Sequence, residues 1–471
     1  MLATLGAFMQ ATAQGWLVLQ LTNSPALLGL VGAIAGLPVL LLAAVAGVMA
    51  DRLDRRRLLA WGYWAGAALA GSLALLTSLG VVEYWHVALI ALLGGIVITV
   101  QMPASQAVVS SIVDRAVIGG AIALNSAQYN LARIIGPSIA GLSIAAGGLA
   151  FGFWANAIAL VIVGFVIARL PIPVTRAGNR ASAALWGDLQ DGVRYVANDP
   201  ILSVLILLAA APALFVLPYL TFVPVFARDI LVIGAPGLGL LTGSIGVGAL
   251  IGALLMASRR PSGGSGRLLL LGLGSISVSL FVFATSRSVI LSMVALAILG
   301  ASQVAYYSTT NTLIQLRVPA RLRGRVHSLY VLTSIGLLPI GNLASGAIAE
   351  RTGVPAVLAV GALVTLGATI LAAVVRPSLR LVASGPAGAA SSPSIGPDRP
   401  ASSPSVGPDR QASSPSIGPD RPAWSAPDNS VRGSASSADP APITETFSIE
   451  VASDNTNDRS PIGPDPGAPP T

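Results

Sequence analysis

The chain lacks both cysteine and lysine, and only 10% of its 471 residues are charged. A soluble domain carries about 25% charged residues, so a chain with 54% apolar residues and so little charge has the composition of a membrane protein. Without cysteine there is no disulfide, thiolate metal site or thiol nucleophile. Two histidines cannot build a His-rich metal cluster, and without lysine no phosphate-binding G-x-x-x-x-G-K-[ST] loop exists. We therefore expect no metal, no cofactor and no enzyme activity.

Apolar runs long enough to cross a bilayer, about 20 residues each, fill most of the chain. They predict twelve transmembrane helices at 1–21, 26–50, 57–80, 84–112, 117–146, 148–170, 200–226, 234–257, 266–285, 288–316, 325–349 and 354–376. The longer connection 171–199 separates two sets of six. The expected fold class is an all-α membrane protein with an N-terminal six-helix bundle (1–170), a linker and a C-terminal six-helix bundle (200–376).

An internal repeat supports this division into halves. A shift of 205 residues lays Gly136 and Gly141 over Gly341 and Gly346, at equivalent hairpins of the two sets. Such duplicated halves are common in transporter folds.

Arginine placement predicts the orientation. Alternate loops carry 18 arginines and the other loops carry 3, which is a positive-inside pattern. We therefore expect a multi-pass protein of the plasma (inner) membrane with both termini in the cytoplasm. The sequence pI near 10.5 therefore reflects topology, and we expect no nucleic-acid partner. The first apolar run has no basic n-region, so no cleavable signal peptide is expected.

Two segments differ from the apolar runs. Residues 181–197 place apolar side chains at helical spacing against Asp188, Asp191 and Arg194, which predicts an interfacial amphipathic helix on the cytoplasmic side or a linker packed on the bundle. From 377 to 471 the chain is rich in Pro, Ser and Gly, and an 11-residue repeat begins at 391, 402 and 413. Nothing there could bury enough apolar area to offset ordering, so we predict a disordered tail.

The loop at 47–57 carries the most specific motif. Gly47, Asp51, Arg52, Arg55 and Arg56 resemble the signature G-x-x-x-D-R-x-G-R-R/K of the major facilitator superfamily, with Asp54 where the family usually has Gly. The resemblance implies that Asp51 faces the start of the eleventh predicted helix, near 324–328. It also implies that Arg55 pairs with Asp114 to close the cytoplasmic side. The alternative is that these arginines serve topology alone.

A second motif lies in the fifth predicted helix. Gly136, Pro137 and Gly141 resemble the superfamily's antiporter motif, a kinked and closely packed helix. The stretches 16–25, 47–57 and 103–141 resemble one branch of the superfamily, that of the enterobactin exporter and related efflux proteins. That resemblance implies export of a small amphipathic compound, drug-like or siderophore-like, against protons.

Polar residues inside the apolar runs are the candidate substrate contacts. Arg133 lies near mid-membrane, where a charged side chain is costly and normally faces a cavity or a partner. The others are Tyr129, Asn130, Gln10, Gln14, Gln303, Tyr306, Tyr307 and Asn311. Hydrogen bonding between helices is the alternative role for each of them.

Acidic residues are absent from the middle of every predicted span. All nine acids before residue 377 lie at span ends or in loops, so proton coupling would have to use a boundary acid such as Asp51 or Asp114. We expect a monomer whose partners are a small-molecule substrate, the lipid bilayer and possible counter-transported protons. An importer and a non-transporting scaffold that uses the tail are the alternatives.

Overall fold

Helices make up all the regular structure that the computed structural model describes, which covers residues 1–112, 118–170, 185–259, 265–319 and 321–377. These residues belong to one compact unit, Met1–Ile395. Some side chains inside α2, α4, α5 and α7 are outside the description, Asp51 and Arg52 among them. The predicted disordered tail and Asp114 also lie outside the described residues.

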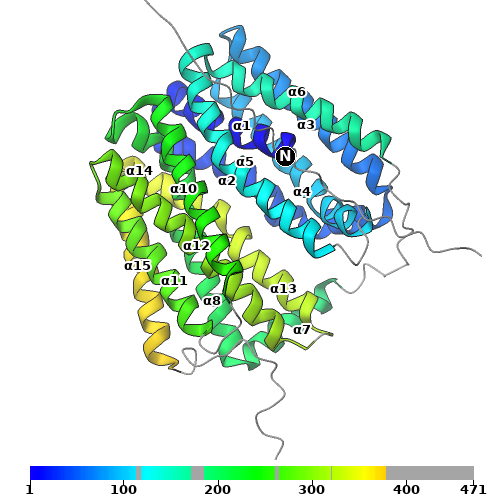
Figure 1. The fold of residues 1–471 in the computed structure, drawn as a ribbon, viewed down its shortest axis with the longest axis vertical. Helices are drawn as coiled ribbons and strands as arrows, with labels where there is room; N and C mark the ends of the chain where they lie inside the picture. Colours follow the sequence, from blue (N-terminus) through cyan, green and yellow to red (C-terminus); the bar gives the residue numbers. More distant parts are fainter. Residues whose placement is uncertain (113–117, 171–184, 260–264, 320, 378–471) are drawn as a thin grey trace, which may run out of the picture. The chain divides into compact units, whose positions relative to one another are not determined.

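The helices form two groups joined by a short helix (Figure 1). The first group comprises α1 (Leu2–Thr22), α2 (Pro25–Arg52), α3 (Arg55–Ser78), α4 (Tyr84–Ile112), α5 (Ile118–Gly147) and α6 (Leu149–Arg169). The joining helix is α7 (Leu185–Asn198). The second group comprises α8 (Pro200–Phe215), α9 (Tyr219–Val225), η2 (Phe226–Ile230), α10 (Gly234–Ala257), α11 (Ser265–Thr285), α12 (Val289–Arg317), α13 (Arg323–Val331), η3 (Leu332–Gly336), α14 (Leu338–Thr352) and α15 (Val354–Val375).

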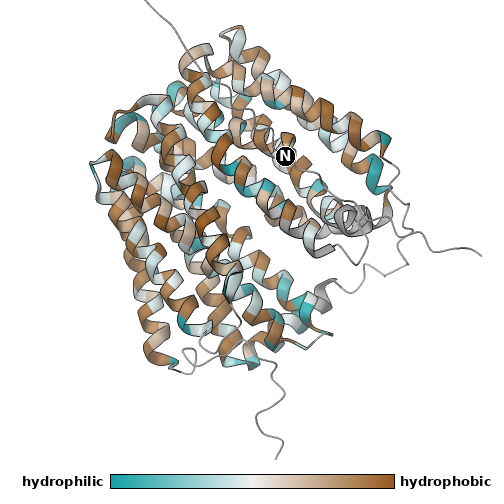
Figure 2. Cartoon of the chain, viewed as in Figure 1, coloured by the Kyte–Doolittle hydropathy of each residue, from teal (hydrophilic) through white to brown (hydrophobic). Residues whose placement is uncertain are grey.

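Ten helical spans within the described residues are long and apolar enough to cross a membrane. Figure 2 shows apolar residues along the helices and hydrophilic residues mainly toward their ends. The predicted first and fifth spans, now α1 and α5, fall outside that set, although both are long enough. Their polar side chains, such as Gln10 and Arg133, lower their hydropathy. Both helices pack within the first group, and α5 also packs on α10 of the second.

Two spans predicted as single helices are interrupted. The span 200–226 is broken between α8 and α9, because Pro212 and Pro218 have no amide hydrogen to donate. A five-residue π-helical segment, η2, begins at the last residue of this span and extends beyond it to Ile230, and a second one, η3, lies inside the span 325–349. In the span 325–349, Pro339 near the start of α14 prevents the preceding helix from continuing.

Short polar residues begin the helices that follow the tight loops. The Ser24 side chain accepts a hydrogen bond from the Leu27 amide at the start of α2. Asp54 accepts from the amides of Arg56 and Arg57 and so caps α3. The departure of Asp54 from the family's usual glycine therefore has a local structural role.

The two groups meet through glycines that allow close backbone approach. A Cβ added at Gly29 of α2 would lie 2.5 Å from the Asn342 carbonyl oxygen and 2.9 Å from the Cα of Gly346 in α14. On α5, a Cβ at Gly141 would lie 2.5 Å from the Ala235 carbonyl oxygen and 3.1 Å from the Cα of Gly239 in α10. Two pairs of helices thus hold the halves together.

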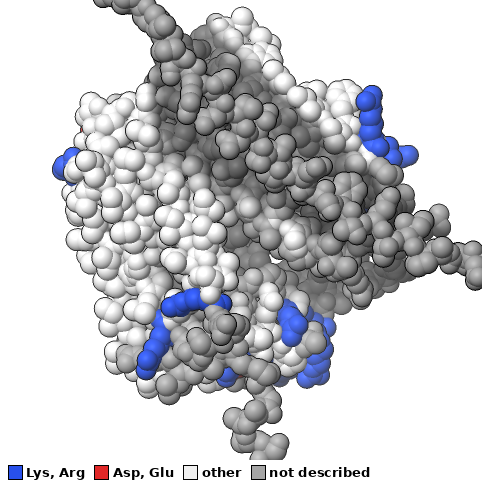
Figure 3. Space-filling model, viewed as in Figure 1, with Lys and Arg blue, Asp and Glu red and all other residues white. Residues whose placement is uncertain are grey.

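These contacts lie toward one end of the helices. We call the end that contains the loops before α2, α10 and α15 the arginine-poor end. The opposite end, where α3 and α11 begin and α12 and α15 finish, is the arginine-rich end. Figure 3 shows most of the visible arginines on the lower and right-hand parts of the face, with one more at its left edge. At the arginine-rich end, a Cβ at Gly47 or Gly324 would meet no described atom within 4 Å.

Candidate functional site

A cluster of polar side chains brings together residues of α5, α9, α12 and α13. We call Arg133, Tyr219, Gln303, Tyr306, Tyr307 and Tyr330 the polar cluster. At its centre the Tyr219 hydroxyl donates a hydrogen bond to Gln303 Oε1 at 3.5 Å, and both residues are buried. Tyr219 begins α9 directly after Pro218, so the helix break at Pro218 helps to place its side chain.

Two polar atoms in this cluster are buried with no hydrogen-bond partner among the described residues: Gln303 Nε2 and the Tyr307 hydroxyl. The Tyr307 hydroxyl lies close enough to Tyr219 and Tyr330 to interact with both electrostatically. A buried donor without a partner costs about 1–3 kcal/mol, and a bound molecule or water could satisfy it. These two atoms therefore mark the part of the cluster best suited to contact a ligand.

Tyr306 has a different role from its neighbour. Its hydroxyl donates to the Leu208 carbonyl oxygen at 2.8 Å, and its ring is fully buried. The rings of Tyr306 and Tyr307 meet edge to face with centroids 5.2 Å apart. Tyr306 therefore joins α12 to α8, and its ring packs against the ring of Tyr307.

Arg133 supplies the charge of the cluster. It lies near the middle of α5, and its guanidinium lies close enough to the Tyr219 hydroxyl to interact with it electrostatically. Among the described helices of membrane-spanning length it is the one charged residue away from the helix ends. The structure thus brings Arg133 of the first group to Tyr219 of the second.

Other predicted substrate candidates are engaged within their own half. The Gln10 Oε1 accepts a hydrogen bond from Asn156 Nδ2 at 2.5 Å, which joins α1 to α6. The Asn311 Oδ1 accepts from Gln315 Nε2 at 2.9 Å on α12. Tyr129 is half exposed and meets Phe8 edge to face at 5.5 Å.

Two further candidates have less specific surroundings. Gln14 is half-buried on α1, and Asn130 is half-buried on α5 and has an interaction there. Their part in substrate contact stays a prediction.

The predicted helix-5 motif forms two packing contacts. A Cβ at Gly136 would lie 2.8 Å from the Phe8 Cβ in α1, while Gly141 meets α10. Pro137 lies inside α5, and its carbonyl oxygen would be 2.8 Å from a Cβ at Gly239. The repeat-equivalent glycines behave alike: Gly341 packs against the Leu214 backbone of α8, and Gly346 against Gly29 of α2.

The predicted cytoplasmic gate can be followed only in part. Arg56 donates to the Ala168 carbonyl oxygen and so ties α3 to the end of α6. Arg55 begins α3 and has an interaction of its own. Because Asp51, Arg52 and Asp114 have no described side chains, the contact of Asp51 with 324–328 and the Arg55–Asp114 pair stay predictions.

A second set of contacts joins the halves at the arginine-poor end. Glu350 Oε2 accepts from the Ser24 hydroxyl at 2.8 Å and from the Ala26 amide at 3.0 Å. Arg228 donates to the Leu19 carbonyl oxygen at 2.6 Å and to Asn23 Oδ1. Sequence reasoning did not single out these residues, because polar residues in short loops carry no pattern that predicts partners so distant along the chain.

Charge pairs at the arginine-rich end lie within the second half and its linker helix. Arg317 donates to Asp199 Oδ2 at 2.7 Å, and Arg325 donates to Asp191 Oδ2 at 2.6 Å, from α13 to α7. Burial raises the pKa of the Asp199 carboxyl, but hydrogen bonds from Arg317 and two backbone amides outweigh it and hold the pKa below its usual range. These pairs fix α7 and the start of α8 to the second group.

This architecture of two helix groups, joined at glycine contacts around a polar cluster, is that of a major facilitator superfamily transporter. The chain belongs to the transmembrane secretion effector family, whose model matches residues 1–393. The resemblance predicted from the loop at 47–57 is thereby confirmed at the level of the family, and the protein is a transporter rather than an enzyme.

An efflux pump and an exporter are among the relatives of the chain. It is 27% identical to the multidrug efflux pump Tap of Mycolicibacterium fortuitum, over 72% of this chain and 85% of that protein. It is 28% identical to the enterobactin exporter EntS of Shigella flexneri, over 62% of this chain and 68% of that protein. A crystal structure of a D-xylose-proton symporter shares the fold, with a TM-score of 0.63 and 13% identity over 79% of this chain and 95% of that one.

Proposed function

We propose that this transporter exports a small amphipathic compound from the cytoplasm and binds it at the polar cluster. The observation that carries the proposal is the cluster itself, in which Arg133 of one half reaches Tyr219 of the other beside unpartnered polar atoms of Gln303 and Tyr307. Residues from both halves at one site suit a carrier that moves its halves around the substrate.

The charge of the cluster favours a substrate with an anionic or strongly hydrogen-bond-accepting group. Arg133 is a cation away from the span ends, and the acids of the described spans lie near span ends. Arg133 is therefore expected to gain from a substrate that supplies negative charge. Export as the direction is supported by the efflux pump and the siderophore exporter among the relatives.

The arginine count supports a cytoplasmic location for the arginine-rich end and for both termini. With that orientation, the glycine contacts and the Glu350 hydrogen bonds would close the external side, and the structure would represent an inward-facing state. Asp51 would then reach the start of α13 only after the transporter turns outward. Proton coupling through Asp51 or Asp114, and a monomeric state, belong to the same proposal.

Transport measured in two directions tests the proposal. Cells that express the protein should accumulate less of an anionic catechol probe than cells without it, and inverted membrane vesicles should take the probe up. Arg133→Gln should slow this transport by about tenfold or more, since a hydrogen bond to a charged group contributes about 1.5–3 kcal/mol. Arg287→Gln, which changes an exposed arginine at the arginine-poor end, is the matched control.

Two results would overturn this assignment. Accumulation of the probe inside expressing cells would make the protein an importer. Normal transport by a well-folded Arg133→Gln variant would remove the cluster from substrate binding.

A further inference from the structure

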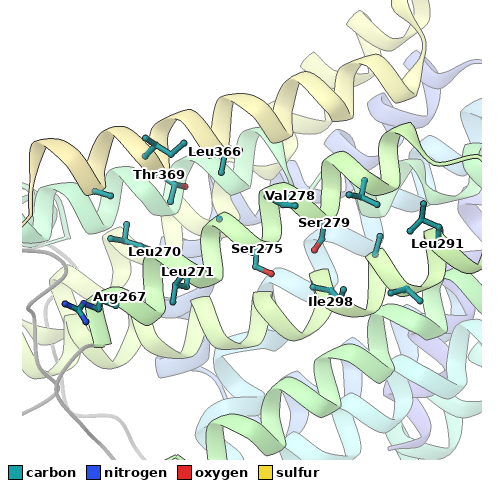
Figure 4. A pocket seen from close by; sticks show the side chains of 16 residues that line it. Arg267, Leu270, Leu271, Ser275, Val278, Ser279, Leu291, Ile298, Leu366 and Thr369 are labelled. Atoms are coloured by element: carbon teal, nitrogen blue, oxygen red, sulfur yellow. The ribbon is translucent and has the colours of Figure 1, made fainter.

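A groove of about 750 Å³ lies on the surface formed by α11, α12 and α15 (Figure 4). Leu271 and Val278 of α11, Val294 and Ile298 of α12, and Ile370 of α15 line it, and all five are exposed in the structure of the chain alone. In a multi-pass membrane protein, exposed apolar side chains on a spanning helix face the acyl chains of the bilayer. The groove is therefore a recess in the lipid-facing surface.

Polar groups in the groove are largely satisfied within the protein. The Ser275 and Ser302 hydroxyls form a hydrogen bond with each other at 2.8 Å, and the Thr369 hydroxyl donates to the Thr365 carbonyl oxygen at 2.7 Å. The remaining lining is almost entirely aliphatic. Such a lining suits a flexible hydrocarbon chain and offers little to a substrate rich in polar groups.

The groove is separate from the polar cluster. On α12 it is lined by Leu291, Val294, Ala295 and Ile298, whereas the cluster uses Gln303 and the residues after it. Ile298 and Gln303 are five residues apart, which places them on largely opposite faces of a helix with 3.6 residues per turn. A molecule in the groove would thus lie outside the route between the two halves.

One end of the groove carries a positive charge. Arg267 lines it at the arginine-rich end, near the start of α11 (Figure 4). Ala373 of α15 also lines the groove, and Arg376 follows one turn later in the direction of the same end. The lining contains no acidic residue. A lipid with a negative headgroup would meet favourable charge there.

The length of the groove fits a lipid chain. From Arg267 to Val282 the lining follows α11 for about 22 Å at 1.5 Å per residue. One leaflet of the hydrocarbon core is about 15 Å thick, half of the bilayer value. A headgroup at Arg267 would therefore leave the whole of one acyl chain inside the groove.

We propose that this groove is a binding site for one anionic phospholipid of the leaflet on the arginine-rich side, with an acyl chain along α11 and the headgroup phosphate at Arg267. The site holds a lipid against the second half of the transporter rather than a transported substrate.

Two glycines allow a matched test of the acyl-chain site. Gly274 lines the groove and Gly367 of α15 does not, and a Cβ added at either meets nothing within 4 Å. Gly274→Leu should fill the groove without a clash, and Gly367→Leu is its control. The full-length transporter, purified in mild detergent, is mixed with phosphatidylglycerol or phosphatidylcholine, and bound lipid is counted by native mass spectrometry.

The wild type and Gly367→Leu should retain one phosphatidylglycerol. Gly274→Leu should bind it about tenfold more weakly, because loss of the burial of two acyl-chain methylenes is enough to weaken binding by that factor. Arg267→Gln should remove the preference for phosphatidylglycerol over phosphatidylcholine, whereas Arg287→Gln should keep it.

The proposal is overturned if Gly274→Leu and Gly367→Leu retain lipid equally, or if Arg267→Gln leaves the headgroup preference unchanged. It is also overturned if the wild type is a dimer that Gly274→Leu converts to a monomer, because the groove would then be a contact between two copies of this chain. Should Gly274→Leu fail to fold, the Arg267→Gln comparison decides the question alone.

Discussion

The two ends of the molecule hold their helices together by different chemistry. At the arginine-poor end the halves touch through glycine backbones, with Gly29 against Gly346 and Gly141 against Gly239. At the arginine-rich end the described contacts are charge pairs within the second half and its linker helix, such as Arg325 with Asp191. Close packing depends on shape and short distance, whereas charge pairs act over longer distances and respond to salt. The two ends should therefore respond to different perturbations.

Filling a glycine contact should have the largest effect. Gly29→Leu places a side chain where even a Cβ would lie 2.5 Å from the Asn342 carbonyl oxygen, so the arginine-poor end can no longer close. Overpacking of this kind costs about 1–3 kcal/mol, and we expect efflux to fall by about tenfold to a hundredfold.

Gly94→Leu, on α4, is the matched control, because a Cβ at Gly94 meets no described atom within 4 Å. Since the chain has no cysteine, a single cysteine introduced at Ala26, which is half-buried at the start of α2, can report closure by its rate of thiol labelling. Faster labelling in Gly29→Leu and unchanged labelling in Gly94→Leu is the expected result. Equal labelling in both would mean that glycine packing does not close this end.

Removal of the Glu350 carboxylate should have an intermediate effect. Glu350→Ala leaves the Ser24 hydroxyl and the Ala26 amide without their partner in α14, although both lie near water. Because each exposed hydrogen bond contributes about 0.5–1.5 kcal/mol, thiol labelling of a cysteine at Ala26 should rise severalfold. Glu83→Ala, at an exposed loop of the same end, is the control, and an equal rise there would contradict a specific role for Glu350.

The smallest effect should come from the arginine-rich end. The pKa of Asp199 is lowered in the folded protein, so its contribution to stability is present above its unfolded pKa and is lost as pH falls through the lowered value. Asp199→Asn should lower the thermal midpoint by a degree or two at neutral pH, and this difference should shrink as pH falls through the lowered pKa and the wild-type carboxyl becomes protonated. A difference that persists at low pH would assign the effect to helix capping rather than to charge.

Sequence patterns predicted the elements of the fold that depend on length and apolar content. The family, the all-helical membrane fold and the class of transporter are confirmed. The breaks at Pro218 and before Pro339 were missed because each lies within a continuous apolar run, where hydropathy contains no information on backbone hydrogen bonds. The repeat that pairs Gly141 with Gly346 was visible in the sequence, and the structure gives these two residues equivalent contacts.

The candidate site was predictable in its types of residue but not in its grouping. Arg133, Gln303 and Tyr307 were identified as polar residues inside apolar runs, and the structure relates them through Tyr219. Tyr219 itself carried no signal beyond a tyrosine after a proline. Gln10 looked equivalent to Gln303 in sequence, yet it bonds Asn156 inside the first half. Which face of a helix a polar residue occupies depends on packing between distant segments, and one sequence alone does not supply that.

The glycine contacts between the halves have an evolutionary consequence. Because Gly29, Gly141, Gly239 and Gly346 meet through backbone atoms, these contacts between the halves do not involve the side chains of the polar cluster. If the polar cluster binds the substrate, as proposed above, mutations there would change the transported compound and leave the glycine contacts intact. One scaffold could then acquire a new substrate by a few substitutions.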